Sequence, residues 1–258
     1  MIKNLEGCLE EVAAFIHNES VSFDHRKIEI KQLNNLVSYV DKEAEKKLVE
    51  KLSLLVPEAK FETEEETVAQ FKAGLRWIID PLDGTTNFSH GIPTYSISVA
   101  LAEGDSLLAS GVYEVNQKEF FSAEKGKGAF LNGERIHVAR NEQLANSLIA
   151  TGFPYYEFEG LDAYIEILKK FMQTTRGVRR LGSAATDLCY TACGRFDGFF
   201  EFNLNSYDVA GGILIVKEAG GIVSDFSGVE GRFDGVETLA AGGVYAEMLD
   251  VINSFWKN

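Results

Sequence analysis

Two stretches near the start of the chain repeat apolar side chains at helical spacing. Over residues 4–20 these positions are Leu5, Cys8, Leu9, Val12, Ala13 and Ile16. Over residues 41–55 they are Ala44, Leu48, Leu52 and Leu55. Apolar residues three or four positions apart lie on one face of a helix, so each stretch predicts an amphipathic helix that packs on a core. Pro57 ends the second helix, because proline disrupts helical hydrogen bonding.

Short runs of β-forming residues follow. The run Trp77-Ile78-Ile79 predicts a buried strand that closes at Asp80, and Pro81 is expected to stop it because proline has no backbone N–H. Further strands are predicted over residues 95–102, 107–115 and 119–123, and a hairpin over residues 128–136. Asn132-Gly133 is typical of a type I′ turn. This part of the chain therefore predicts an antiparallel meander.

Strands and helices alternate beyond a polar stretch near residues 140–147. Strands are predicted over 148–152, 177–181, 198–202 and, as the last one, 221–224, with helices over 161–172, 183–193 and 208–219. Such alternation is typical of an open sheet flanked by helices. We therefore predict an α+β half over residues 1–143 and an α/β half over residues 144–258.

Composition narrows the class of protein. The formal net charge is −14, which leaves no basic stripe for nucleic acid, and no apolar run is long enough to span a membrane. The three cysteines, Cys8, Cys189 and Cys193, have no disulfide spacing, so we expect a cytoplasmic protein. Cys189 and Cys193 share one face of a predicted helix; we interpret them as packing residues rather than metal ligands, since no histidine accompanies them.

The segment after the Trp77 strand carries candidate chemistry. Asp80 and Asp83 flank the Leu82 carbonyl, which makes a compact set of oxygen ligands of the kind that Mg²⁺ prefers. The backbone N–H groups of residues 84–86 follow directly and are able to face an anion. A cation site beside an anion site is what metal-assisted hydrolysis of a phosphate ester requires. The alternative is a turn with an aspartate at each shoulder that caps a helix.

Other carboxylates have ordinary local interpretations as well. Asp41 and Asp208 stand at predicted helix starts, where aspartate is a common cap. Residues 62–66 hold four glutamates and read as a solvated loop, and Glu201 stands at a strand end. Arg179, Arg180 and Arg195 are interpreted as surface or interdomain charges, with contact to a second substrate phosphate as the alternative.

The nine residues Asp80-Pro81-Leu82-Asp83-Gly84-Thr85-Thr86-Asn87-Phe88 resemble, without a gap, the signature of the inositol monophosphatase family. Members of this family are Mg²⁺-dependent, lithium-sensitive phosphatases of sugars and polyols. Asp41 with its preceding residues, the pair Glu64-Glu65 and the segment 206–213 are similar to the other family motifs, in the same order. The sequence departs from the pattern at Thr63, where glycine is usual, and at Tyr207, where tryptophan is common.

The resemblance implies a five-layered αβαβα fold with a metal site between its two halves, usually in a homodimer. The implied ligands of two or three Mg²⁺ ions are Glu64, Asp80, the Leu82 carbonyl, Asp83 and Asp208. The implied catalytic residues are Thr85, which would bond to Asp41, and Glu65, which together orient and deprotonate the attacking water. The implied substrate contacts are Gly84, Thr85, Gly182, Ser183, Ala184 and Glu201. Glu66 offers the same chemistry as its neighbours, so the glutamate register stays open by one residue.

We therefore expect hydrolysis of a polyol or sugar phosphate monoester, with inositol monophosphate as the first candidate. Fructose-1,6-bisphosphatase activity is one alternative. Another is 3′(2′),5′-bisphosphate nucleotidase activity, although that branch usually has a lysine and an acidic residue where this chain has Thr86-Asn87. A non-catalytic protein that binds metal or phosphate is the third. The expected partner is a small phosphorylated polyol or sugar, with no nucleic acid and no membrane.

Overall fold

A computed structural model of the chain describes residues 1–21, 28–32, 35–153, 158 and 160–256. Its helices are α1 (Ile2–Val21), α2 (Tyr39–Leu55), α3 (Thr85–Ser89), α4 (Leu161–Thr174), α5 (Ala184–Ala192), α6 (Ser206–Glu218) and α7 (Tyr245–Phe255), with a 3₁₀ turn at Leu144–Asn146. Within these described residues, no helix has both the length and the apolar composition that a bilayer crossing needs.

Seven strands form a large sheet in the order β3-β4-β5-β6-β7-β8-β9. They are β3 (Lys60–Thr63), β4 (Leu75–Asp83), β5 (Ser96–Glu103), β6 (Ser106–Glu114), β7 (Glu119–Glu124), β8 (Gly128–Leu131) and β9 (Glu134–Ile136). All neighbours pair antiparallel except β3 and β4, which are parallel. Asn132 and Gly133 have φ values of 48° and 82°, the left-handed pair that a type I′ turn requires. The predicted meander and its hairpin are confirmed.

A second sheet has five strands in the order β11-β10-β12-β14-β13. They are β10 (Leu148–Thr151), β11 (Gly177–Arg179), β12 (Gly198–Phe202), β13 (Ile222–Ser224) and β14 (Glu237–Ala241). β10 is parallel to both of its neighbours, and β14 is antiparallel to β12 and β13. Two further strands, β1 (Ile28–Gln32) and β2 (Asn35–Ser38), form a separate antiparallel pair.

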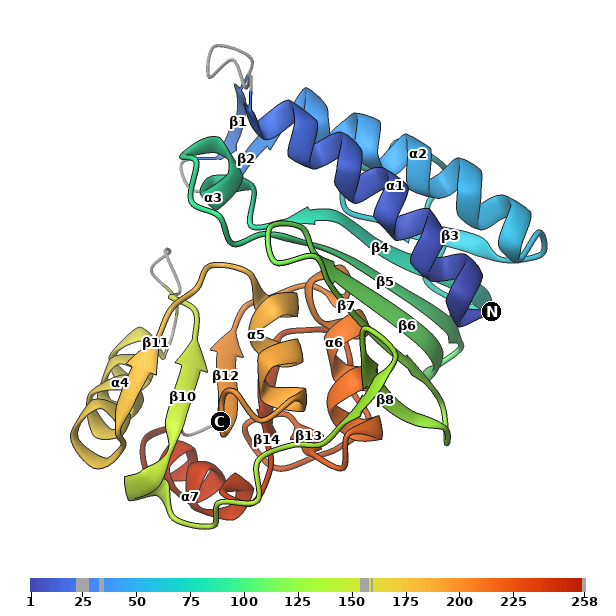
Figure 1. Ribbon diagram of the computed structural model, residues 1–258. Helices are drawn as coiled ribbons and strands as arrows, with labels where there is room; N and C mark the ends of the chain where they lie inside the picture. The colour runs from blue at the N-terminus through green and yellow to red at the C-terminus, as the bar shows by residue number, and fades with distance from the viewer. Residues whose placement is uncertain (22–27, 33–34, 154–157, 159, 257–258) are drawn as a thin grey trace.

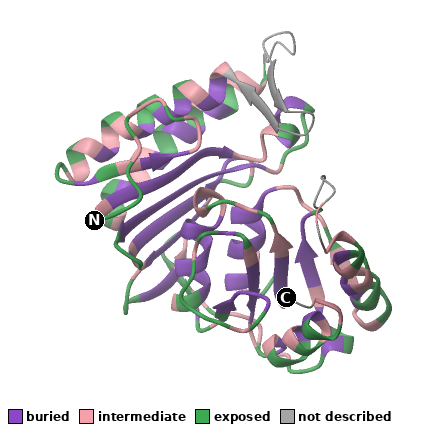
Figure 2. Ribbon diagram, turned by 180° about the vertical axis from the view of Figure 1, so that it is seen from behind, coloured by how far each residue is buried: buried purple, intermediate pink, exposed green. Residues whose placement is uncertain are grey.

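The elements stack in five layers, αβαβα, as Figure 1 shows. Helices α1 and α2 cover one face of the large sheet, α5 and α6 lie between the two sheets, and α4 and α7 cover the outer face of the small sheet. The strands and the two central helices are largely buried (Figure 2). Cys189 is fully buried in the core around α5 and α6, and Cys193 packs against the same core, which agrees with the packing interpretation.

Two expectations about strands are wrong. The strand that carries Trp77 does not stop at Pro81 but runs to Asp83, and its pairing with β5 is irregular between Asp80 and Asp83. Proline is compatible with this strand because the ladder skips it at the irregularity, where no N–H is needed. Residues 221–224 are not the last strand either. β14 and α7 follow, and β14 inserts between β12 and β13.

Candidate active site between the two sheets

The signature segment forms a sharp turn from β4 into α3. Gly84 has a φ of 102°, and a Cβ at this position would lie 3.1 Å from the Thr94 carbonyl oxygen and 3.2 Å from the Gly182 carbonyl oxygen. A residue with a side chain would therefore be strained and would clash with backbone. The Asp80 carboxylate accepts a 2.9 Å hydrogen bond from the Leu82 N–H. The turn places Asp80, Asp83 and Thr85 together at the end of the strand.

Four carboxylates face one another at this end of the large sheet. Glu64 follows β3, Asp80 and Asp83 lie on β4, and Asp208 lies in the first turn of α6. Glu64 is within hydrogen-bonding reach of Asp80, and both have a pKa well above the usual range because of burial and the neighbouring carboxylates. Burial also raises the pKa of Asp83 to about 6 and that of Asp208 to about 7. Like charges crowded in a buried space make a site that a cation would stabilise.

The donor set fits a hard cation. Every donor in this cluster is an oxygen, and carboxylate and carbonyl oxygens are the ligands that Mg²⁺ prefers. Within the described part of the chain, no three His, Cys, Asp or Glu side chains are already arranged as a metal-ligand group. Glu64, Asp80, Asp83 and Asp208 are nevertheless close enough for neighbouring carboxylates to raise the pKa of Glu64, Asp80 and Asp208. Their mutual electrostatic perturbation, rather than a completed coordination shell, is the observation in favour of a cation site.

Asp208 has two structural roles at once. Its Oδ2 accepts hydrogen bonds from the Asn205 N–H (2.6 Å) and the Asn205 side-chain amide (3.2 Å), which completes a capping box at the start of α6. The same side chain lies close to the cluster: Asp83 helps burial to raise the pKa of Asp208, and Asp208 helps to raise the pKa of Glu64 and Asp80. The capping and ligand interpretations of Asp208 are thus compatible.

Asp41 and Thr85 form a direct contact. Thr85 Oγ1 lies 2.8 Å from Asp41 Oδ1 and 3.1 Å from the Leu82 carbonyl oxygen. Asp41 is the third residue of α2 and is fully buried, so it is not the N-cap that the local pattern suggested. Gly84 occupies the N-cap position of α3, and the Thr85 hydroxyl contributes no cap. The neighbouring Thr86 is exposed.

The three glutamates after Thr63 differ in their surroundings. Glu64 is half-buried and close to Asp80, and Glu65 is also half-buried. Glu66 is exposed, has a φ of 52°, and lines a different cleft. This geometry favours the register in which Glu64 belongs to the carboxylate cluster.

A small cavity of about 140 Å³ adjoins the cluster. Its lining includes Asp83, Gly182, Ser183, Ala184, Glu201 and Asp208. Glu201 packs tightly over Gly152, since a Cβ on that glycine would lie only 1.7 Å from Glu201 Oε1. Burial raises the pKa of Glu201 to about 8, and the Arg180 guanidinium opposes this rise. Glu201 is therefore a cavity residue and not an exposed strand end.

Two further residues line the cavity that sequence reasoning did not place there. Arg180 was interpreted as a surface or interdomain charge, but it lines this cavity. Its guanidinium charge opposes the rise in pKa of Asp83, Asp187 and Glu201. The guanidinium also lies 6.0 Å from the centre of the Phe153 ring. Asp187 is buried within α5, and its Oδ1 has no hydrogen-bond partner among the described residues. Burial raises the pKa of Asp187 well above its usual range. The one signal in the sequence that could have marked Asp187 as a site residue was its place among the apolar positions of a predicted helix.

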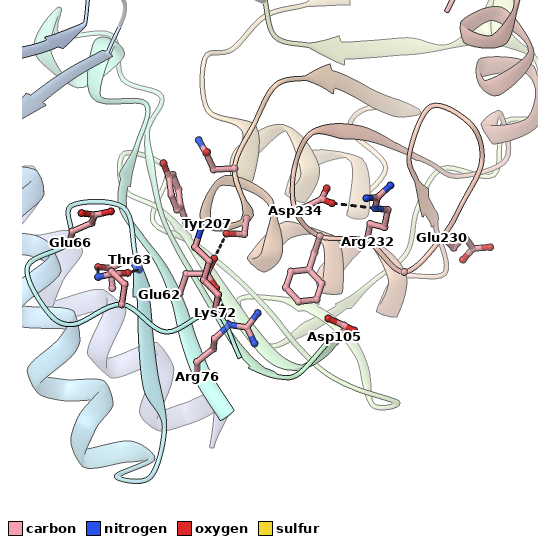
Figure 3. A pocket seen from close by; sticks show the side chains of 15 residues that line it. Glu62, Thr63, Glu66, Lys72, Arg76, Asp105, Tyr207, Glu230, Arg232 and Asp234 are labelled. Atoms are coloured by element: carbon pink, nitrogen blue, oxygen red, sulfur yellow. Dashed lines mark hydrogen bonds and ion pairs between the residues drawn. The ribbon is translucent and has the colours of Figure 1, made fainter. Parts of the chain in front are cut away.

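A larger cleft, of about 650 Å³, lies beside the cluster (Figure 3). It is lined by Glu62, Thr63, Glu66, Gln70, Lys72, Arg76 and Asp105 from the first half and by residues 205–207 and 230–234 from the second. Four of its eight charged lining residues form ion pairs with each other. Arg76 bonds to Glu62 at 2.8 Å in a buried ion pair, and Arg232 pairs with Asp234 at 3.2 Å. Ser206 donates a 2.5 Å hydrogen bond to Glu62 and so links the two halves.

The layered fold and the carboxylate cluster agree with what a comparison of the sequence finds. Residues 6–256 match the inositol monophosphatase family, and the chain belongs to that family. Membership of this family supports phosphatase activity, and the family is generally metal-dependent.

Individual relatives carry two kinds of name. SuhB of Neisseria meningitidis serogroup B is 46% identical over 235 residues, which covers 90% of each chain. The inositol-1-monophosphatase of Mesorhizobium japonicum is 38% identical over 224 residues, 86% of this chain and 84% of the relative. The SuhB relatives, that of Escherichia coli among them, carry the name Nus factor. Among solved structures, the extragenic suppressor protein SuhB of Bartonella henselae superposes with a TM-score of 0.90 at 33% identity over 97% of each chain.

Proposed function

We propose that the protein is a Mg²⁺-dependent phosphatase that hydrolyses the phosphate monoester of a polyol or sugar, with inositol monophosphate as the first candidate. The observation that carries the proposal is the cluster of Glu64, Asp80, Asp83 and Asp208 beside the 2.8 Å contact between Thr85 and Asp41. This arrangement places negative charge that binds cations next to a hydroxyl that is able to move a proton.

The ligands of the metal would be the four carboxylates of this cluster together with the Leu82 carbonyl. When bound, Mg²⁺ supplies neutralisation of the phosphate charge and activation of water. The protein holds the ligands in place beforehand. Asp83 Oδ2 accepts 2.7 Å hydrogen bonds from Ser183 Oγ and from the Ala185 N–H, so its other oxygen remains for the cation. Two or three ions would fit the number of carboxylates.

Thr85 and Asp41 would move the proton of the attacking water. The Thr85 hydroxyl donates to Asp41, which leaves lone pairs on Thr85 Oγ1 that are able to accept a proton from water. As the water oxygen forms its bond to phosphorus, its proton passes to Thr85 and the threonine proton passes to Asp41. Glu65 orients the same water. The ester P–O bond breaks in line with the attack, and the departing oxygen takes a proton from solvent. Positioning and electrostatics carry this chemistry, and no covalent phospho-enzyme is needed.

The small cavity would receive the alcohol part of the substrate. Its Glu201 carboxyl group is placed to exchange hydrogen bonds with polyol hydroxyl groups, and Gly182 and Ala184 line the same cavity. A volume of about 140 Å³ is below the roughly 300 Å³ at which typical small-molecule sites begin. This favours a compact polyol or sugar over a nucleotide. Arg180 keeps a bisphosphate as the alternative substrate.

A phosphate-release assay with and without Mg²⁺ tests the proposal. The panel contains inositol monophosphate, fructose 1,6-bisphosphate, 3′-phosphoadenosine 5′-phosphate and simple sugar phosphates. We expect release of phosphate from the polyol or sugar monoesters with Mg²⁺ and none after chelation. Release from none of them would support the non-catalytic alternative, and preference for a bisphosphate would redirect the substrate assignment.

A second candidate function is that of a Nus factor, because SuhB relatives carry that name. The observation that favours it is the 46% identity to a SuhB protein over 90% of both chains. Direct binding of RNA is not expected, because a formal net charge of −14 opposes contact with the phosphates of the RNA backbone. Fluorescence anisotropy with a labelled RNA at physiological salt tests this expectation; saturable binding would contradict it.

A homodimer in the cytoplasm remains part of the proposal, and sedimentation of the purified chain tests the dimer.

A further inference from the structure

Helix α2 carries two buried carboxylates one turn apart. Asp41 contacts Thr85, as described above, and Glu45 follows four residues later on the same face of the helix. Both side chains have no exposed surface. Burial of a carboxylate is costly unless hydrogen-bond donors surround it. The partners of Glu45 therefore indicate what the residue does.

All four donors to Glu45 come from the segment that carries the glutamate pair. Glu45 Oε1 accepts from Thr63 Oγ1 (2.9 Å), from the Thr67 N–H (2.7 Å) and from Thr67 Oγ1 (2.6 Å). Glu45 Oε2 accepts from the Glu65 N–H at 2.7 Å. One side chain thus holds the Thr63 hydroxyl before Glu64 and the Glu65 N–H after it, and Glu64 is a member of the carboxylate cluster.

Gln70 closes the same loop from the other direction. Its side-chain oxygen accepts from the Thr63 N–H at 2.7 Å, and its amide nitrogen donates to Thr63 Oγ1 at 2.9 Å. The Thr63 hydroxyl in turn donates to Glu45, so the contacts run in sequence from Gln70 through Thr63 to Glu45. The same loop is also closed through its backbone, because the Phe71 N–H donates to the Phe61 carbonyl at 2.8 Å. The side-chain bonds of Gln70 and Glu45 add to this closure and fix the segment around Glu64.

We propose that Glu45 is a positioning residue that sets the place of Glu64 and Glu65 relative to the Asp41–Thr85 pair, and so sets the affinity of the site for Mg²⁺. The inference rests on the proposed function. Glu45 is not one of the proposed ligands of the cation. Its effect passes through the Glu65 N–H and through Thr63 and Thr67, and its place on α2 ties that loop to the helix that also holds Asp41.

Glu45→Gln separates this role from a purely structural one. A glutamine keeps one oxygen, which is able to retain the three donors now on Oε1, but its NH₂ group then faces the Glu65 N–H. Two donors cannot bond to each other, so the backbone beside Glu64 has to move. Thr67→Val is the milder second variant, because it removes one hydroxyl donor and keeps the volume. Glu43→Gln is the matched control on the same helix, since Glu43 is exposed and bonds to Lys46.

The experiment is calorimetric titration of the full chain with Mg²⁺ in the absence of substrate, together with kcat at saturating Mg²⁺ and circular dichroism as a check on folding. We expect the Kd for Mg²⁺ to rise about 10- to 100-fold in Glu45→Gln, the range typical of residues that support metal ligands. A smaller rise is expected in Thr67→Val and none in Glu43→Gln. High Mg²⁺ should restore most of kcat in both Glu45→Gln and Thr67→Val.

An unchanged Kd for Mg²⁺ in folded Glu45→Gln would overturn the inference, as would a loss of kcat that high Mg²⁺ does not restore. If Glu45→Gln does not fold, Thr67→Val decides by the same two readouts. The proposed function fails separately: a wild-type chain that binds Mg²⁺ but releases phosphate from no ester would refute the phosphatase assignment and leave the positioning role of Glu45 in place.

Discussion

Substitution of Thr85 by alanine removes a single hydroxyl at the centre of the proposed proton transfer. That hydroxyl contacts Asp41, which is fully buried, at 2.8 Å. A hydrogen bond to a charged group contributes about 1.5–3 kcal/mol to stability. Domains of this kind are stable by about 5–15 kcal/mol, so Thr85→Ala should stay folded at 25 °C. Loss of structure alone therefore cannot reduce turnover by more than a small factor.

Loss of the proton transfer has a much larger effect on rate. General acid–base catalysis contributes about 10²- to 10⁴-fold, which corresponds to roughly 3–5 kcal/mol of activation free energy. We expect Thr85→Ala to lower kcat by this factor at saturating Mg²⁺ and to leave KM and Mg²⁺ affinity close to their original values. That combination is characteristic of an interaction made mainly in the transition state. The assay measures kcat, KM, the Mg²⁺ dependence and the thermal midpoint of the same preparation.

Thr86→Ala and Thr85→Ser are the controls. Thr86 is exposed and has no proposed proton-transfer role, so its substitution should change stability by less than about 0.5 kcal/mol and leave kcat unchanged. Thr85→Ser keeps a hydroxyl and should recover much of the rate. Equal losses of activity in Thr85→Ala and Thr86→Ala, in proportion to their loss of stability, would show that Thr85 is not a catalyst.

Three other outcomes follow from the geometry. Asp83→Asn keeps the shape of the side chain and removes one charge, so turnover should fall more than about 100-fold while the metal-free fold survives; wild-type activity at saturating Mg²⁺ would contradict the ligand role. In the metal-free protein, burial raises the pKa of Asp83 to about 6 and that of Asp208 to about 7, so the folded state binds more protons than the unfolded chain above about pH 4. Stability in a chelator should therefore fall from pH 5 to pH 8, and Mg²⁺ should restore it; thermal scans at fixed ionic strength measure both, and a rise in stability with pH would refute the assignment. Ser206→Ala removes the 2.5 Å bond to Glu62 and should cost about 1–2 kcal/mol in urea unfolding, with no change if the bond is absent in solution.

Local patterns predicted those elements whose hydrogen bonds are also local. The α1 and α2 helices and the β5–β9 meander have clear periodicity and turn residues, and they lie close to their predicted bounds. β14 has no comparable signal, because its place between β12 and β13 depends on strands distant in the sequence. α7 begins after Val244 without a side-chain cap, so nothing local marked its start. The division into halves at residue 143 stays a prediction.

The candidate site was accessible from the sequence only where a motif marked it. Asp80 and Asp83 were candidate cation ligands from their spacing around the Leu82 carbonyl, and the resemblance to the family signature strengthened that interpretation. Asp208 was named only from its resemblance to a family motif, because locally it has an ordinary interpretation as a helix cap. Arg180 and Asp187 were not placed in the site, since an arginine at the end of a predicted strand and an aspartate in a helix are common. Glu45 was missed for a different reason. Its role depends on four donors some twenty residues away, and only the folded chain brings them together.

The contacts between the halves suggest how metal binding and closure of the site are coupled. The carboxylates come from both halves, so their repulsion in the metal-free protein acts to separate the halves. Opposing it are bonds that cross the same boundary: Asp83 accepts from Ser183 and from the Ala185 N–H, each at 2.7 Å, and Asn87 donates to the Leu181 carbonyl at 2.7 Å. A cation that neutralises the cluster removes the repulsion and leaves these bonds unopposed. Ligand binding and association of the halves then stabilise each other, as linkage requires.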